Sequence, residues 1–197
     1  MSTAPNAHPP VLQPPGKGLP PLELFFARIL VGWQARRTTR SEADRIFRFE
    51  RAEILRLARE LSEEQGRKQV LIKRLPGLED SSRYWSVYMT VEHLRIVNTG
   101  MQGIILSLLR GQLPPKVVRT ADVKPAPTVG PEVLEQFDQV CAEYESAVHS
   151  LPDLKSQLTW AHPWFGELNA ERWNFFSGFH MALHRKQILA IRRALGV

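Results

Sequence analysis

Several features that define large protein classes are missing or rare in this sequence. Cys141 is the only cysteine, which excludes an intramolecular disulfide and a cysteine-based metal cluster. This suits a reducing compartment, and we expect a cytoplasmic protein. The longest apolar stretch, LELFFARILVGW at 22–33, is interrupted by Glu23 and Arg28 and is too short to cross a bilayer. We therefore expect no membrane partner and assign this stretch to an extra N-terminal helix that faces the core or docks on it.

Strand signals are also scarce. The run QVLIKRL at 69–75 is the only short β-like segment, and no internal repeat is present. The first 21 residues contain seven prolines and no apolar run, which is unlike a signal peptide. We expect a disordered proline-rich lead over 1–21, followed by a single helical domain over 22–197.

The net charge of +6 is confined to the first part of the chain. Residues 1–75 contain 14 basic and 8 acidic residues, and the remainder is neutral. Arginine and glutamate alternate at helical spacing after residue 36, which predicts a solvated helix face with ion pairs. Nucleic-acid binding by this segment is the alternative, and it would show a steep salt dependence. We do not expect a nucleic-acid partner.

Apolar residues recur at three- and four-residue spacing in four long segments, which predicts an all-α four-helix bundle. Ser41 begins the first helix and Gly66 ends it, whereas Gly130-Pro131 opens the third and Asn169 caps the fourth. The connections 111–130 and 152–168 are long, and the former is long enough to cross the bundle. The predicted helices cover residues 41–65, 81–110, 131–152 and 169–195.

Three of the six histidines fall on inward-facing stripes of these helices. His180 and His184 are one turn apart on the fourth helix, and His93 lies near the middle of the second. Each on its own has a simple alternative interpretation, a packed core histidine with one hydrogen bond. Together at matching depth they predict a bundle-core metal site, since three nitrogen ligands with an open position are typical of catalytic zinc.

Three segments resemble the DinB-like (YfiT-like, damage-inducible) superfamily of metalloenzymes. FHMALHRKQI at 179–188 is similar to its C-terminal H-x-x-x-H-R-x-Q signature, and SSRYWSVYMTVEHLRIV at 81–97 is similar to its second helix. AHPWFGELNAERWNFF at 161–176, which leads into the fourth helix, is similar to a related branch of unknown function. The likeness covers roughly residues 40–195 and leaves 1–36 unexplained. It implies an up-down-down-up bundle with a metal site formed by His93, His180 and His184.

The resemblance also implies a class of function. A divalent ion on three neutral ligands keeps its positive charge and activates water or a low-molecular-weight thiol. Zinc is the first choice of metal, and nickel, cobalt, manganese and iron fit three imidazoles as well. We expect a small-molecule substrate and a metal-dependent thiol S-transferase or hydrolase. The alternative is a non-catalytic, stress-associated interaction protein that binds metal under the aromatic loop.

Two further residues are candidates for binding a substrate. His162 lies in the aromatic loop before the fourth helix and either lines the mouth of the site or shapes a turn. Arg185 follows His184 and either attracts an anionic substrate or is a solvated surface residue. A homodimer is compatible with the sequence.

Overall fold

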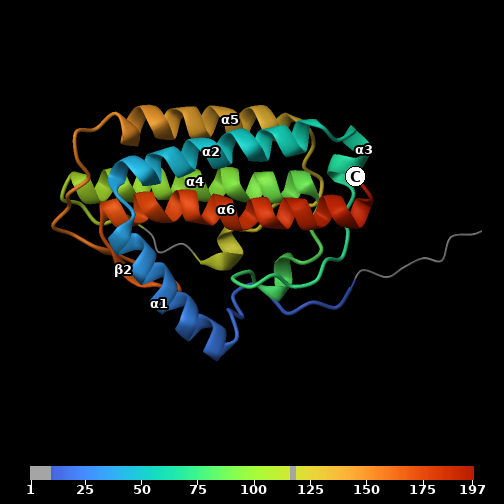
Figure 1. Cartoon of the computed structure of the whole chain (residues 1–197), viewed down its shortest axis with the longest axis horizontal. Helices are drawn as coiled ribbons and strands as arrows, with labels where there is room; N and C mark the ends of the chain where they lie inside the picture. Colours follow the sequence, from blue (N-terminus) through green and yellow to red (C-terminus); the bar gives the residue numbers. More distant parts are fainter. Residues whose placement is uncertain (1–9, 116–118) are drawn as a thin grey trace, which may run out of the picture.

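The computed structural model describes residues 10–115 and 119–197, and they form the predicted all-α four-helix bundle (Figure 1). The bundle helices are α2 (Arg40–Arg59), α4 (Val87–Leu109), α5 (Glu132–Tyr144) and α6 (Ala170–Leu195). Helix α1 (Pro21–Arg37) is the extra N-terminal helix and lies outside the bundle at an angle to it. Among the described residues, no helix is long and apolar enough to span a membrane.

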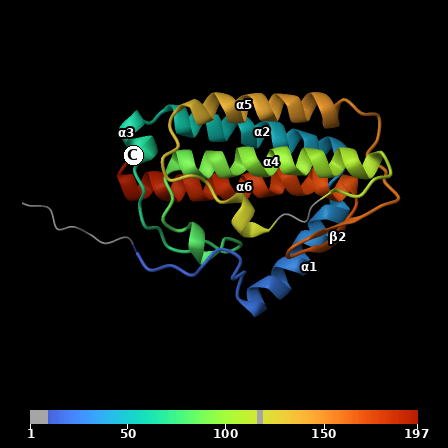
Figure 2. The same cartoon turned by 180° about the vertical axis from the view of Figure 1, so that it is seen from behind.

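The colours of Figures 1 and 2 show the order of the helices in space. Helices α2 and α6 run in one direction, and α4 and α5 both run in the other, which is the up-down-down-up arrangement. Helices α4 and α5 are therefore parallel neighbours, and the chain between them must return along the length of the bundle. This crossover contains a short 3₁₀ helix, η2 (Thr120–Val123), that lies beside the bundle.

Local sequence signals determine where the helices begin. Ser86 caps α4 by accepting a hydrogen bond from the Met89 amide, and Asn169 caps α6 in the same way from Arg172. The first predicted helix, 41–65, extends too far at its C-terminus, because α2 ends at Arg59. Ser62 accepts from the Gln65 amide and starts a separate short helix, α3 (Glu63–Arg67), so the sequence from Leu61 turns away from α2.

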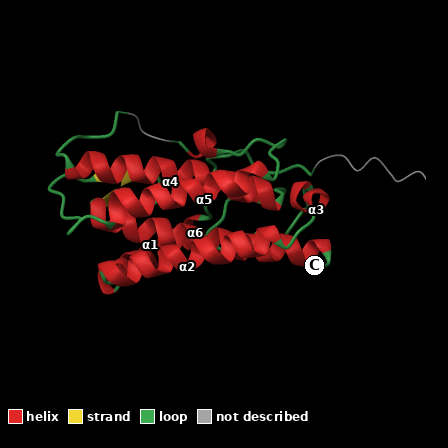
Figure 3. Ribbon diagram, turned by 90° about the horizontal axis from the view of Figure 1, so that it is seen from above, coloured by secondary structure: helices red, strands yellow, loops and turns green. Residues whose placement is uncertain are grey.

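The only strands of the described residues do not lie in the β-like run of the sequence. Residues 68–79, with the β-like run, contain no strand, whereas β1 (Trp160–His162) pairs antiparallel with β2 (Gly166–Leu168) in the connection before α6. Figure 3 shows this hairpin beside the helices. The hairpin lies in the aromatic segment, where Gly166 adopts the positive φ of 74° that its turn requires.

The second half of the proline-rich lead is hydrogen-bonded to another segment of the chain. Gly16 and Gly18 have positive φ, and their amides donate to the Glu79 carboxylate at 3.1 and 3.0 Å. The Gln13 amide donates to Asp80 in the same way, and Leu19 is buried. Residues 10–20 are thus bound to the loop before α4, while residues 1–9 of the predicted lead lie outside the described residues.

The core lies between α2, α4, α5 and α6. Phe47 of α2 stacks on Tyr144 of α5 with ring centroids 4.5 Å apart, and both side chains are fully buried. Helices α2 and α6 approach closely at Gly178, where an added Cβ would lie 3.2 Å from the Phe47 amide nitrogen. The small residue therefore permits the tight α2–α6 contact.

A group of buried polar residues, named the Asp44 cluster, links α2, α5 and α6. The Asp44 carboxylate accepts hydrogen bonds from Arg40 and, at 2.8 Å, from the Asn174 amide. The Tyr144 hydroxyl donates to the Asn174 side-chain oxygen at 3.0 Å and lies 2.8 Å from Ser177 Oγ. His149 ends the π-helical turn η3 (Glu145–His149), and its Nε2 lies 3.3 Å from the Asp44 carboxylate.

Candidate metal centre

The three predicted histidines meet inside the bundle. His93 lies on α4 and is buried, and His180 and His184 project from α6 toward it. The Nε2 atom of His180 lies 3.3 Å from that of His93 and 3.1 Å from that of His184. One nitrogen from each ring lies within 4.8 Å of the others, so the cluster has the composition and spacing of a metal site.

The outer nitrogens of two rings are held by acceptors. His93 Nδ1 lies 2.9 Å from the Val123 carbonyl oxygen, which can accept a hydrogen bond but cannot donate one. His184 Nδ1 lies 2.8 Å from Gln187 Oε1. The Gln187 amide nitrogen donates to the Ser82 carbonyl at 2.8 Å, which fixes its oxygen toward His184. Both Nδ1 atoms therefore carry the ring proton, and both Nε2 atoms present a lone pair.

These lone pairs converge on one point. His180 Nε2 faces both, and with one proton it can satisfy only one of its two neighbours. Three nitrogens bound to zinc at about 2.0 Å in a tetrahedral arrangement are separated from one another by about 3.3 Å. The separations of His180 Nε2 from the other two Nε2 atoms, 3.3 and 3.1 Å, are close to that value, so the cluster could hold a cation.

Burial keeps the cluster uncharged. It lowers the pKa of His93 to about 4, partly opposed by the hydrogen bond to Val123. Burial also lowers the pKa of His180 and His184 well below the ordinary value, and the neighbouring imidazoles add to this effect. All three rings are neutral near pH 7, which is the form that binds metal.

Aromatic rings form the walls of the site. Trp85 stacks nearly parallel to His184 and lies 5.2 Å from His93 between ring centroids. Phe176 stacks on His180 from the preceding turn of α6, at 6.1 Å. His93 and His184 are buried, whereas His180 is only partly buried. His180 is therefore the most exposed residue of the three.

The two predicted substrate residues lie in different surroundings. His162 ends β1 and packs on Phe176 at 4.4 Å between ring centroids, close enough that its charge would lower the pKa of His180. Burial lowers the pKa of His162 itself to about 4. Arg185 instead forms a two-bond ion pair with the buried carboxylate of Glu50 on α2, at 2.5 and 3.1 Å. The structure places His162 against Phe176, the ring that stacks on His180, and commits Arg185 to the α2–α6 contact.

The sequence interpretation missed the residues that orient the ligands. Gln187 lies within the family-like signature and on the inward stripe, three residues after His184, so its helical spacing was an available signal. The carbonyl groups of Val123 and Ser82 belong to irregular segments. Backbone acceptors of this kind have no side-chain signature, and only the folded crossover brings Val123 to His93.

Comparison with known proteins agrees with this architecture. A sequence model of the DinB superfamily matches residues 46–188. The chain belongs to the DinB superfamily. A solved protein described as TT2238, a four-helix bundle protein, has the same fold: it is 24% identical, with a TM-score of 0.57 over 77% of this chain and 99% of that chain. None of the curated proteins matches this sequence.

The matched region divides this DinB protein into two parts. All three clustered histidines, His162 and Gln187 lie within residues 46–188. Helix α1 and the bound lead lie before it and are additions to the part of the chain that the DinB model covers.

Proposed function

We propose that this protein is a metal-dependent enzyme in which His93, His180 and His184 hold one divalent ion, with zinc as the first choice. The observation that carries the proposal is the convergence of imidazole nitrogens whose outer partners leave their lone pairs facing inward. Nickel, cobalt, manganese or iron would fit the same ligands. Three neutral ligands leave the ion's charge uncompensated and a coordination position open.

The proposed reaction is transfer of a low-molecular-weight thiol to a small substrate, with hydrolysis as the second reaction. When bound, the ion supplies a Lewis acid that lowers the pKa of a water or thiol beside it. The protein contributes fixed tautomers on His93 and His184 and a more open approach beside His180. Aromatic walls at Trp85 and Phe176 exclude bulk water and strengthen charge interactions within the site.

His162 is the proposed substrate contact. Its Nδ1 accepts a hydrogen bond from the Trp164 amide at 3.1 Å, so the proton of the neutral ring is on Nε2. With its pKa lowered to about 4, this ring stays neutral near pH 7. His162 is therefore suited to donate a hydrogen bond to a substrate rather than to remove a proton.

The first test is metal content. After equal dialysis against trace zinc, wild type is expected to retain one ion per chain, whereas His93→Gln, His180→Gln and His184→Gln each lose it. His149→Gln is the matched control, because it removes another buried imidazole that lies outside the cluster. Absence of stoichiometric metal in wild type, or its retention in all three variants, contradicts the proposal.

The second test separates catalysis from metal binding alone. Cobalt-substituted protein is titrated with a small thiol, and the open position predicts a new sulfur-to-cobalt absorption band and thiol transfer in an activity screen. If cobalt binds without any response to thiol or water-dependent turnover, the non-catalytic alternative holds.

A further inference from the structure

Helix α1 carries a second apolar face that nothing in the described chain covers. Val31 is buried and Ala35 packs toward the core, so one side of the helix is bound to the protein. The opposite side bears six large apolar residues whose exposed fractions run from 51% to 76%. We call them the α1 stripe: Leu22, Phe25, Phe26, Ile29, Leu30 and Trp33.

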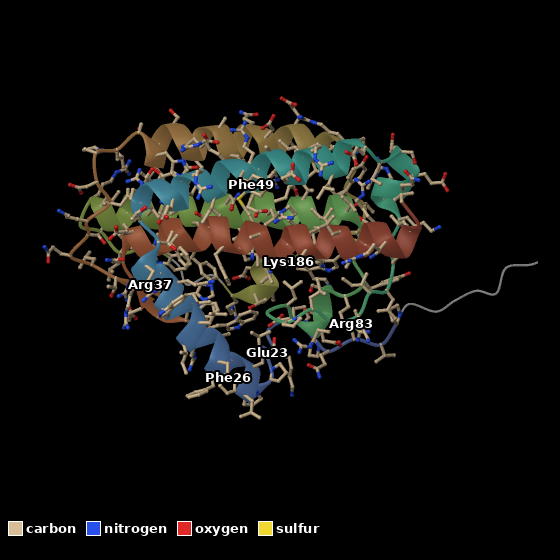
Figure 4. All side chains as sticks on the ribbon, in the orientation of Figure 1. Glu23, Phe26, Arg37, Phe49, Arg83 and Lys186 are labelled. Atoms are coloured by element: carbon tan, nitrogen blue, oxygen red, sulfur yellow. The ribbon has the colours of Figure 1, made fainter. Side chains whose placement is uncertain are left out.

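The spacing of the α1 stripe makes it one continuous surface. Its members follow one another at alternating intervals of three and one residues, which places them within one broad face of an α-helix. Figure 4 shows α1 extending from the bundle, with Phe26 on the side away from it. A helix that is apolar on both sides is normally buried on both, so this stripe needs a partner.

The area and composition of the stripe fit a protein interface. Six side chains of this size present roughly 600 Å² of apolar surface, near the upper end of what a monomer exposes and close to one partner's share of a standard interface. Three of the six are aromatic, and charged groups are absent from the centre of the stripe. Arg37 lies over the Trp33 ring at 4.6 Å, a pairing that suits the edge of such an interface.

We infer that α1 is a dimerisation helix, and that its stripe packs against the stripe of a second copy of this chain. A twofold interface needs only one patch, because each protomer presents the same surface to the other. Antiparallel packing brings Phe26 of one copy next to Ile29 of the other and keeps the Arg36–Arg37 ends apart. The helix is held firmly enough to do this: Glu23 pairs with Arg74 and accepts from the Gly77 amide, and Arg28 donates to the Trp164 carbonyl.

The experiment measures the mass of the full chain in solution by light scattering across a concentration series. Wild type is expected to have the mass of two chains. Phe26→Glu with Ile29→Glu is expected to have the mass of one, since buried carboxylates at an interface centre weaken association by about a hundredfold or more. Leu113→Glu, at a residue 58% exposed in the loop after α4, is the matched control and is expected to remain a dimer.

Folding is checked separately by circular dichroism, which is expected to give the same helix content for all three proteins because the changed residues are exposed. A wild-type mass of one chain overturns the proposal, as does a double variant that stays dimeric. Co-sedimentation of a monomeric wild type with vesicles of phosphatidylcholine and phosphatidylglycerol, lost in the double variant, would instead assign the stripe to a lipid surface.

Discussion

The histidine cluster and the Asp44 cluster both lie inside the bundle along α6, about one turn apart, and their buried polar groups are paired in opposite ways. In the Asp44 cluster a carboxylate faces a guanidinium and an amide, so acceptors meet donors and the charges cancel. In the histidine cluster the donors point outward to Val123 and Gln187, and acceptors face acceptors. The comparison teaches that a cluster of buried polar groups indicates a ligand only where its donors and acceptors do not pair with one another.

The largest expected loss of stability comes from disrupting the Asp44 cluster. Asp44→Ala removes the carboxylate that accepts from Arg40 and from the Asn174 amide and leaves Arg40 only the Val148 carbonyl in the described part of the chain, and we expect a loss of about 3 kcal/mol in the free energy of unfolding. Zinc stoichiometry should remain at the wild-type value, because the two clusters share no hydrogen bond among the described residues. Chemical denaturation and metal analysis of the same sample check both parts. Joint loss of stability and metal would show that the clusters are one unit.

Zinc bound to the histidine cluster should stabilise the native protein. At a hundredfold excess over its dissociation constant, zinc is expected to raise the free energy of unfolding by about 2.7 kcal/mol through binding to the native state. His180→Gln should show no such response, whereas His149→Gln should respond as wild type does. Thermal melts with and without zinc provide the measurement. An equal response in His180→Gln and wild type would place the bound ion elsewhere.

The tautomer of His184 can be disturbed without removing a ligand. Gln187→Met keeps a side chain of similar length but loses the acceptor for Nδ1, and we expect zinc affinity to fall roughly 10- to 100-fold. Stoichiometry at saturation stays at one ion per chain. Competition with a chelator measures the affinity, and Gln102→Met on α4 serves as the control. Unchanged affinity in Gln187→Met would mean that the amide does not orient the ligand.

The metal-free protein is expected to lose stability as the pH falls. Histidine titrates near 6.5 in an unfolded chain, whereas the native pKa of His93 and of His162 is lowered to about 4. Between these values the unfolded chain binds more protons, so stability falls as the pH decreases from about 6.5 toward 4. The slope is at most about 1.4 kcal/mol per pH unit for each such histidine. Denaturation curves at pH 7 and 5 test this. His162→Phe should reduce the difference in the free energy of unfolding between the two pH values.

The sequence was most informative where side chains alone determine structure. Apolar spacing and the caps at Gly130-Pro131 and Asn169 predicted the bundle, and the depth of His93 matched that of His180 and His184. The predicted end of the first helix, at Gly66, is too late. The Ser62 side chain accepts a backbone hydrogen bond and starts a new helix before Gly66 is reached. The docking of the lead was missed because the lead contributes backbone amides, which have no side-chain signature, to a Glu79 carboxylate more than sixty residues away in the sequence.

The crossover between α4 and α5 has a consequence for the order in which the site is assembled during synthesis. His93 lies in the first half of the chain, Val123 follows in the crossover, and the remaining ligands lie 87 and 91 residues after His93, in the last helix. A growing chain has one ligand until that helix is made, and one imidazole holds a divalent ion poorly. An ion would therefore bind only after α6 has been made, and its binding would stabilise a contact between segments far apart in the sequence.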